Sequence, residues 1–428
     1  MDYSFEKENI CEGVELLTIR ADGFKTACAS VSFVMPLGDK ASLYALIPSI
    51  LIHSSEKYPN ITDIEKKLAH LYGAEIAADV TKIGEHQVIK FEIACIDDRF
   101  ALDGESISDE CCQLLFDLIF KPKLVDGVFD SNVIESEKRL LSERLLAETT
   151  DKKLYAKRRC EEIMFADEIF GINRLGTLKA INSATPETVY EAYNEVIQSA
   201  DITFCVSGGK FSQIKTLINK NLSGIERNVI KSRTLFVEKA TEVKYVKEQQ
   251  DVNQGKLVMG FRMGMTEVTD NYPARRVMVD LFGGSPSSKL FSIVREKMSL
   301  CYYCSARMFR HKGVMFVQSG IESCNEEKAK NAILSQLEDI KNGNFTDSDV
   351  KSSVRALEDA FKSVSDSAEA LESWFTSQII SGEFLYPEDF IKGFGNVTRD
   401  EIIKVASEVT LDTVFMLEGT EQGGEDDE

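Results

Sequence analysis

The sequence predicts an α+β protein made of two similar domains, each a mostly antiparallel sheet covered by helices. Two observations support this fold class. The predicted elements run strand, helix, helix, strand, strand, followed by further helices, which differs from the regular strand–helix alternation of a doubly wound sheet. This order occurs twice along 428 residues, a length at which one hydrophobic core is no longer expected.

The first half begins with a mostly apolar strand at residues 27–35 and an apolar helix at 43–52 that contains Pro48. Thr62 and Glu65 have the spacing of a capping box before a helix that Gly73 ends. Alternating apolar residues then predict a strand that ends at Cys95. The remaining elements expected in this half are helices at 110–120, 129–148 and from Thr185, and a strand at 203–206.

A charged, weakly periodic segment at residues 227–246 is interpreted as a linker. It separates an N-terminal domain, 1–226, from a C-terminal domain, 247–417, and the acidic tail 418–428 is predicted to be disordered. The second half is predicted to hold strands at 256–263, 314–321 and 413–417, and helices at 274–282, 290–297, 326–341, 349–373 and 402–409.

The two halves correspond in the order and type of their elements. Residues 71–93 read as a helix end, a strand, a turn and a second strand, and the same series begins again at Lys297, about 226 positions later. This register aligns Ile76 with Tyr302 and Val88 with Val314. Sequence identity between the halves is weak, so the evidence for an internal duplication is the pattern of elements.

The composition excludes some classes of function. A net charge of −20 is unsuitable for a nucleic-acid groove, which needs a basic face, whereas it would attract basic peptides or simply maintain solubility. Residues 1–10 do not resemble a signal peptide, and the longest apolar run, 43–52, is too short to cross a bilayer. We therefore expect no membrane association and a cytoplasmic location, with the ten cysteines reduced.

Self-contained catalytic machinery is not visible. The chain has four histidines, at His53, His70, His86 and His311. None of them belongs to a His-x-x-Glu-His or inverted zinc motif, so no metal is expected in this chain. Cys301 and Cys304 form an isolated Cys-x-x-Cys, and in a regular strand this odd spacing would send the two thiols to opposite faces. The neighbouring pair Cys111 and Cys112 is expected to lie in the core.

One segment does carry chemistry. Arg295 lies near the end of a predicted amphipathic helix, and Tyr302 follows seven positions later at the start of a strand. A guanidinium and a phenol joined by a helix-to-strand turn would suit a polarised carbonyl or an oxyanion. The alternative is structural: Arg295 would pair with a local carboxylate and Tyr302 would pack in the core.

Residues 283–302 read Gly-Gly-x-x-x-Ser-Lys-Leu-Phe-x-x-x-Arg-Glu-Lys-x-x-Leu-x-Tyr. In a duplicated α+β chain this motif resembles the pitrilysin/insulinase family of zinc peptidases, which includes the mitochondrial processing peptidases. The resemblance covers about residues 28–417 and implies a two-domain clamshell. It also implies that Arg295 holds a substrate carbonyl and that Tyr302, or failing that Tyr303, donates to the developing oxyanion.

Active members of that family place His-x-x-Glu-His on the first helix of the N-terminal half. The matching positions here are Ala45, Pro48 and Ser49, so both imidazole ligands and the glutamate base are missing. The remaining carboxylate ligand of the family comes from a later helix, which here carries Glu135, Glu137 and Glu143. The chain is similar to the bacterial YfmF-like group, whose members are paired with a partner that retains the zinc motif.

The resemblance implies a non-catalytic, substrate-binding subunit of a heterodimeric zinc peptidase that processes peptides or small proteins. Zinc would be held by a homologous partner, the peptide would lie extended against an edge strand, and the isolated chain could form homodimers. The alternative is a binding or scaffold protein that has kept the fold and has no part in proteolysis. An independent metallopeptidase with an unrecognised site is the third possibility, and the missing ligands argue against it.

Overall fold

The computed structural model of the protein describes residues 3–102 and 104–419. This part of the chain forms two compact units, and neither unit is continuous in sequence. The first contains the chain up to Leu146 together with residues 172–233 and 363–384. The second contains residues 147–171, 234–362 and the chain from Leu385 onward. Each half of the sequence thus contributes one segment to the other unit: residues 147–171 join the second unit and residues 363–384 join the first. The domain ranges 1–226 and 247–417 do not include this exchange.

The sheet of the first unit has six strands in the order β1-β2-β6-β3-β5-β4. β2 and β6 are parallel and the other neighbouring pairs are antiparallel. The strands are β1 (Ser4–Cys11), β2 (Val14–Arg20), β3 (Thr26–Pro36), β4 (Glu75–Ile83), β5 (His86–Ile96) and β6 (Asp201–Ser207).

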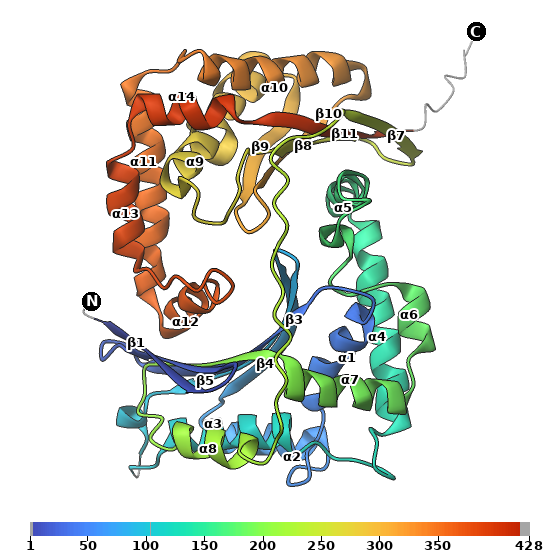
Figure 1. The fold of residues 1–428 in the computed structure, drawn as a ribbon, viewed down its shortest axis with the longest axis vertical. Helices are drawn as coiled ribbons and strands as arrows, with labels where there is room; N and C mark the ends of the chain where they lie inside the picture. The colour runs from blue at the N-terminus through green and yellow to red at the C-terminus, as the bar shows by residue number, and fades with distance from the viewer. Residues whose placement is uncertain (1–2, 103, 420–428) are drawn as a thin grey trace. The chain divides into compact units, whose positions relative to one another are not determined.

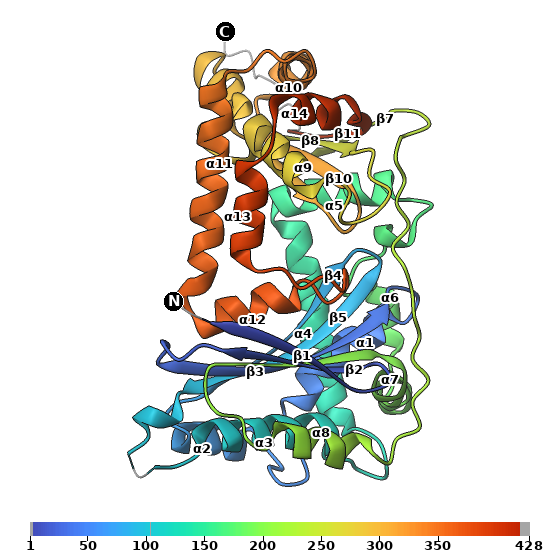
Figure 2. The ribbon, with the colours of Figure 1, turned by 60° about the vertical axis from the view of Figure 1, so that its left-hand side comes forward.

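Helices lie on both faces of this sheet. One face of the sheet is apolar and forms the core with α1, α3 and α7. On the opposite face α12 packs against β3 and β6 (Figure 2). The helices of the first unit are α1 (Ala41–Leu51), α2 (Ile61–His70), α3 (Ile107–Phe120), α4 (Ser131–Thr150, which runs on into the second unit), α6 (Leu178–Ser183), α7 (Pro186–Ser199), α8 (Ile214–Leu222) and α12 (Ala368–Thr376), with a short 3₁₀ turn η1 (Asp98–Phe100) and another, η6 (Ser363–Asp366).

The sheet of the second unit has five strands in the order β7-β11-β8-β10-β9. β7 and β11 are parallel, and the other pairs are antiparallel. The strands are β7 (Lys244–Gln250), β8 (Gly255–Arg262), β9 (Cys301–Phe309), β10 (Val314–Ile321) and β11 (Thr410–Gly419). Of the segment 418–428 that was predicted to be disordered, Glu418 and Gly419 are the last two residues of β11. Residues 420–428 lie outside the described residues.

In the second unit α5 packs on β8 and β11, and α10 and α14 lie on the other side of the sheet (Figure 1). The helices of this unit are α5 (Lys152–Met164), α9 (Tyr272–Val279), α10 (Glu326–Lys341), α11 (Asp347–Lys362), α13 (Pro387–Gly395) and α14 (Arg399–Ser407), with π-helical segments η3 (Asp280–Gly284) and η4 (Leu290–Lys297) and 3₁₀ turns η2 (Ile169–Gly171) and η5 (Ser323–Asn325).

The two sheets share one strand order, which supports the predicted duplication. The series β2-β6-β3-β5-β4 in the first unit corresponds to β7-β11-β8-β10-β9 in the second, including the single parallel pair. Ile76 on β4 and Tyr302 on β9 therefore lie on corresponding edge strands, as the sequence register predicted. The α+β class with antiparallel-dominated sheets is confirmed.

The exchanged helix α5 completes the core on one face of the second sheet. Cys160, Met164 and Phe165 pack with Val258, Phe316 and Phe415. Gly260 allows this approach, because a Cβ at that position would lie 2.6 Å from Met164 Sδ. A larger side chain there would require the Met164 side chain to move.

Three local predictions were wrong. The helix expected at 349–373 is two helices, α11 and α12, because Ser367 caps a new helix by accepting from Ala370 N, and the chain passes to the other unit between them. The cap of α2 is Asn60 instead of Thr62, since Asn60 Oδ1 accepts from Asp63 N. The last three residues of the predicted linker, 244–246, begin β7, which pairs with β11.

Candidate functional site

The positions that would carry a zinc motif lie on α1, whose sequence makes it a core helix. Ala45 and Pro48 are buried, and Ala45 belongs to the main hydrophobic cluster of the first unit. The Ser49 hydroxyl donates to Leu46 O at 3.1 Å, so it satisfies its own helix. A methyl group, a pyrrolidine ring and a hydroxyl used in this way do not fit Zn²⁺, which prefers imidazole, thiolate and carboxylate ligands.

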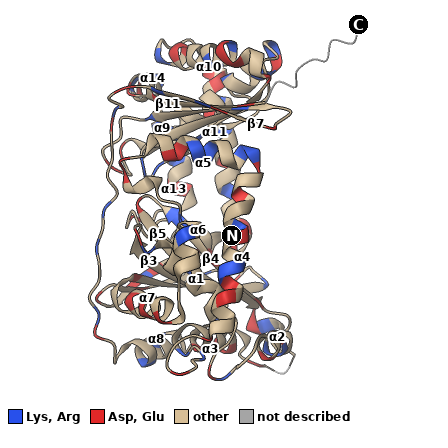
Figure 3. Cartoon of the chain, turned by 90° about the vertical axis from the view of Figure 1, so that its right-hand side faces the viewer, with Lys and Arg blue, Asp and Glu red and all other residues tan. Residues whose placement is uncertain are grey.

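Of the three carboxylates predicted on α4, only Glu137 faces inward. Its carboxylate Oε1 lies 3.1 Å from His53 Nε2, just beyond the end of α1. Glu135 and Glu143 are exposed and pair with Lys138 and Arg139 on the same helix. Figure 3 shows positions of both charge signs along α4, which is typical of a helix with a solvated face.

The contact between His53 and Glu137 was missed from the sequence. His53 follows Ser49 by four positions, one helical turn, and this spacing was the available signal. One imidazole and one carboxylate make two ligands, fewer than the three protein ligands of a catalytic zinc site. The pair is suited to hold α4 against the end of α1.

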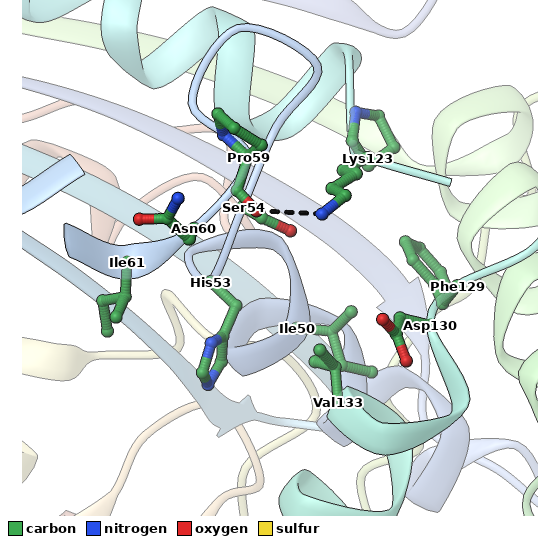
Figure 4. A pocket seen from close by; sticks show the side chains of 11 residues that line it. Ile50, His53, Ser54, Pro59, Asn60, Ile61, Lys123, Phe129, Asp130 and Val133 are labelled. Carbon is green, nitrogen blue, oxygen red and sulfur yellow. Dashed lines mark hydrogen bonds between the residues drawn. The ribbon is translucent and has the colours of Figure 1, made fainter. Parts of the chain in front are cut away.

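A cavity of about 220 Å³ opens beside His53, between the end of α1 and the starts of α2 and α4 (Figure 4). Its polar groups have local partners. Lys123 Nζ donates to Pro59 O at 3.1 Å, and Asp130 Oδ1 accepts from Asn132 N at 2.8 Å. With the imidazole of His53 against Glu137, this cavity has no visible arrangement of a nucleophile and a base.

Within the described residues, the cluster of three or more potential ligands is Cys28, Glu92 and Glu372, on β3, β5 and α12. Lys90 occupies this cluster, since its Nζ lies 2.6 Å from Glu92 Oε2 and 2.5 Å from Glu372 Oε2. Burial raises the pKa of Glu372, and the Ser30 hydroxyl also donates to it. An ammonium already balances these carboxylates, so we interpret the cluster as the attachment of α12 to the sheet.

The second candidate region is the turn from η4 to β9, which carries Arg295 and Tyr302. The predicted helix 290–297 is π-helical: Met298 N donates to Ile293 O at 2.8 Å, five residues back. The chain leaves η4 through Ser299, whose φ of +53° is the left-handed conformation of many helix C-termini. β9 then begins directly at Cys301.

The Arg295 side chain is partly exposed. Its guanidinium stacks over the Phe291 ring at 4.4 Å and its Nε lies 3.4 Å from Glu296 Oε1. Its positive charge also reaches the start of β9, because it helps to lower the pKa of the Cys301 thiol. The structural alternative for Arg295, a local ion pair, is thus present, but an ion pair this exposed contributes little to stability.

Tyr302 is 64% exposed, so the expectation that it packs in the core, the structural alternative, is wrong. It occupies a β-bulge: Tyr303 pairs with Gly320 and Cys301 with Ile321, which leaves Tyr302 as the extra residue of β9. Bulges re-aim side chains and are common beside active sites. β9 is also an edge strand of its sheet.

Tyr303 has different surroundings. Its ring lies flat on β10, where only the absence of a Cβ at Gly320 leaves room, and Lys153 Nζ from α5 lies 4.6 Å from the ring centroid. Burial, with a contribution from Asp151, raises the pKa of Tyr303 to about 12. Because Tyr303 is packed against β10 and its phenol is less acidic, it is a weaker candidate for donating to an oxyanion than the exposed Tyr302.

Comparison with known proteins identifies the family. Residues 183–357 match the model described as the peptidase M16 inactive domain, a range that includes Arg295 and Tyr302. A relative from Bacillus subtilis (strain 168), named "Probable inactive metalloprotease YmfF", is 32% identical over 98% of this chain and 99% of its own length. This chain belongs to the M16 peptidase family. That finding confirms the pitrilysin/insulinase resemblance, and it corrects the group label YfmF to YmfF.

Solved structures agree with this assignment. A conserved protein from Enterococcus faecalis V583 superimposes with a TM-score of 0.89 at 26% identity, covering 97% of this chain and 99% of that one. A peptidase M16 inactive domain from Pseudomonas fluorescens superimposes with a TM-score of 0.77 at 13% identity, covering 97% and 98%. The second likeness shows the M16 fold alone. No described helix is long and apolar enough to cross a membrane.

Proposed function

We propose that this M16 protein is the non-catalytic, substrate-binding subunit of a heterodimeric zinc peptidase. The observation that carries the proposal is a contrast between two regions of one chain. The zinc-motif positions Ala45, Pro48 and Ser49 are built into a helix that packs in the core, whereas Tyr302 is 64% exposed on a bulged edge strand. The first region has no side chains that could bind zinc, whereas the second has an exposed phenol that a substrate could reach.

Peptide hydrolysis divides naturally into two such halves. One side must supply a metal-activated water, and the other must hold and polarise the scissile carbonyl. In the proposal Arg295 binds a substrate backbone carbonyl and Tyr302 donates a hydrogen bond to the developing oxyanion. The water and its metal belong to a homologous partner with an intact His-x-x-Glu-His.

An extended peptide fits this arrangement. β9 pairs with β10 on one side and ends the sheet on the other, so its outer backbone groups are available for strand addition. Backbone pairing of this kind gives affinity with little dependence on sequence, and the pockets for alternate side chains would set the choice of peptide. The proposed substrates are therefore peptides or small proteins that present an extended segment.

The reconstituted pair tests the proposal. This chain and an M16 homologue from the same genome that carries His-x-x-Glu-His would be purified separately and assayed, alone and mixed, on a quenched-fluorescence peptide library. We expect cleavage only in the mixture, zinc in the partner alone, and loss of cleavage when the partner's motif glutamate is changed to glutamine.

Two outcomes would reject it. Cleavage by this chain alone would mean that it holds a complete site. A mixture that forms a stable complex without cleaving any peptide, in the presence of bound zinc, would favour the alternative of a binding or scaffold protein derived from a peptidase. The proposed cytoplasmic location would be checked separately by fractionating the native cell.

A further inference from the structure

Cys301 and Cys304 lie on the same face of β9, although their odd spacing in a regular strand predicts opposite faces. The bulge at Tyr302 explains the difference. Cys304 pairs with Ser319 and Cys301 with Ile321, two positions further along β10, so the extra residue restores a common face. Both cysteines are buried, and their side chains hydrogen-bond to each other. The sequence-based expectation of divergent thiols is thus wrong.

This register also allows an estimate of the separation between the Cα atoms of the two cysteines. Positions two apart on a strand are separated by about 6.7 Å, from a rise of about 3.3–3.4 Å per residue. Disulfides commonly span Cα separations of about 4.4–6.8 Å. The pair is therefore at the long end of the range in which a disulfide closes after a small movement of the backbone.

The two thiols differ chemically. The hydrogen bond from Cys304, followed by one from Ser319 and the charge of Arg295, lowers the pKa of Cys301 to about 7. The Cys301 contact and burial raise the pKa of Cys304. At neutral pH the thiolate is thus mainly on Cys301, and a neutral thiol stands beside it, which is the arrangement of an attacking and a resolving cysteine.

We propose that Cys301 and Cys304 are an oxidisable dithiol that a hydroperoxide converts into a disulfide, and that this conversion changes the conformation of β9 at Tyr302. The Cys301 sulfur attacks one peroxide oxygen, the O–O bond breaks, and the other oxygen leaves as water or an alcohol. The Cys304 sulfur then attacks the sulfur of the resulting sulfenic acid, the S–O bond breaks, and the hydroxyl leaves as water with the proton of the Cys304 thiol. The two sulfurs supply the two electrons that reduce the peroxide.

The conformational change is expected at the bulge of β9. β9 pairs with β10 alone, and its bulge stands between the two cysteines. Drawing Cys301 and Cys304 together shortens the strand across the bulge, so Tyr302 must be displaced. The proposal extends beyond the peptidase assignment, because the thiol chemistry and the strand movement need only this chain.

The chain contains its own control. Cys95 on β5 and Cys111 on α3 are also buried and hydrogen-bonded to each other. There the contact with Cys111 and burial, with the charges of Asp98 and Asp97, raise the pKa of Cys95 far above its usual value. The Cys95–Cys111 pair is thus a second hydrogen-bonded thiol pair, on an inner strand and a helix, that lacks the bulged edge strand of Cys301 and Cys304.

The experiment uses the full chain with the exposed thiols removed as Cys11→Ser and Cys324→Ser, which prevents disulfides between molecules. Hydrogen peroxide is titrated at neutral pH, peptides are mapped by mass spectrometry, and β9 is followed by hydrogen exchange. We expect the Cys301–Cys304 peptide to lose two hydrogen masses before the Cys95–Cys111 pair reacts. Exchange in β9 should change at the same peroxide concentration and recover with dithiothreitol.

Matched variants complete the test. Cys304→Ser should stop the reaction at a sulfenic acid on Cys301 that dimedone traps, and Cys301→Ser should abolish both products. The proposal is overturned if both thiol pairs oxidise at the same rate, or if the disulfide forms without any change of exchange in β9. Neither result depends on a partner or on cleavage, so failure here is distinguishable from failure of the peptidase assignment.

Discussion

Tyr302 and Tyr303 are neighbours in the sequence and have the same side chain, yet their surroundings give them different roles. The bulge leaves Tyr302 unpaired and exposed, whereas Gly320 and Lys153 hold Tyr303 against β10. A phenol can stabilise an oxyanion only if it reaches the substrate. The local backbone therefore decides which hydroxyl is available.

Tyr302→Phe and Tyr303→Phe should separate these roles. In the reconstituted pair, Tyr302→Phe is expected to lower the turnover number by on the order of 10²-fold, the scale for losing an oxyanion donor. Tyr303→Phe keeps the packed ring and is expected to change turnover by less than about threefold, because its hydroxyl has no proposed part in the reaction. Steady-state kinetics on one peptide measure both, with Tyr245→Phe, at an exposed tyrosine on β7, as the control. The reverse order of effects would transfer the role to Tyr303.

At the residue scale the sequence was informative where the chemistry depends on identity alone. The loss of the zinc ligands could be read directly from Ala45, Pro48 and Ser49. The common face of Cys301 and Cys304 could not, because one extra residue in a bulge reverses the alternation and no local pattern announces it. The contact of His53 with Glu137 joins positions 84 residues apart, which a single sequence does not specify.

At the scale of elements, each exchanged segment makes buried contacts within the unit that it joins. In the second unit Glu168, from the segment 147–171, accepts from Arg262 on β8 and pairs with Lys312 at 2.6 Å. Both cations are almost fully buried. Burial opposes the charge of Glu168, but these two partners lower its pKa below the usual value of 4.5.

Glu168→Gln should destabilise the protein by about 3–5 kcal/mol at neutral pH, because it removes the carboxylate that pairs with buried Lys312, whereas Arg262 keeps Asp412 as a partner. A lowered pKa in the folded state means that this stabilisation is complete above the unfolded value and is lost as pH falls through the folded value. The difference in free energy of unfolding between wild type and variant should thus shrink below about pH 4.5.

Urea unfolding across a pH series measures this difference. Glu327→Gln, which breaks an exposed pair with Lys330, is the control and should cost less than about 1 kcal/mol. A pH-independent difference for Glu168→Gln would mean that packing, and not charge, explains its effect.

The helix α12 makes the opposite exchange. Phe375 is fully buried and stacks on Phe5 of β1, with ring centroids 4.2 Å apart. Phe375→Ala should cost about 3–5 kcal/mol, and the loss should appear in the first unit although the residue lies late in the chain. Hydrogen exchange would show it as faster exchange in β1 and β3.

The control for that experiment is Phe394→Ala, an equally buried phenylalanine on α13 of the second unit. It should accelerate exchange in α9 and α11, against which α13 packs, and leave β1 unaffected. If Phe375→Ala accelerated exchange in the second unit instead, the division of the chain into these units would be wrong.

Most helices and strands could be predicted from periodicity and caps, and α14 is an example: the helix predicted at 402–409 is present at Arg399–Ser407, and Thr398 and Glu401 form its capping box. The break between α11 and α12 could not be predicted, because apolar residues continue at helical spacing across it. What separates the two helices is the unit in which each one packs: α12 lies on β3 and β6, whereas α11 packs against α13 and α9.

For the whole molecule, duplication explains why a site could be divided. The two sheets share one strand order, so the ancestral unit supplied the same set of positions twice, and each copy could keep or lose a different function. In this chain the first copy has Ala45, Pro48 and Ser49 at its motif positions on a core helix, and the second keeps an exposed tyrosine and a partly exposed arginine. In the proposed partner the first copy would keep the zinc motif His-x-x-Glu-His, and the second copy would not need the Arg/Tyr pair.

The most direct test of this account is the turnover number of the reconstituted pair when this chain carries Arg295→Ala. The account predicts a fall of on the order of 10²-fold, with the partner's zinc content and the affinity of the two chains unchanged. Arg307→Ala, at an exposed arginine two positions before the end of β9, should leave turnover within about twofold. Equal turnover for wild type and Arg295→Ala would contradict the claim that this chain supplies half of the active site.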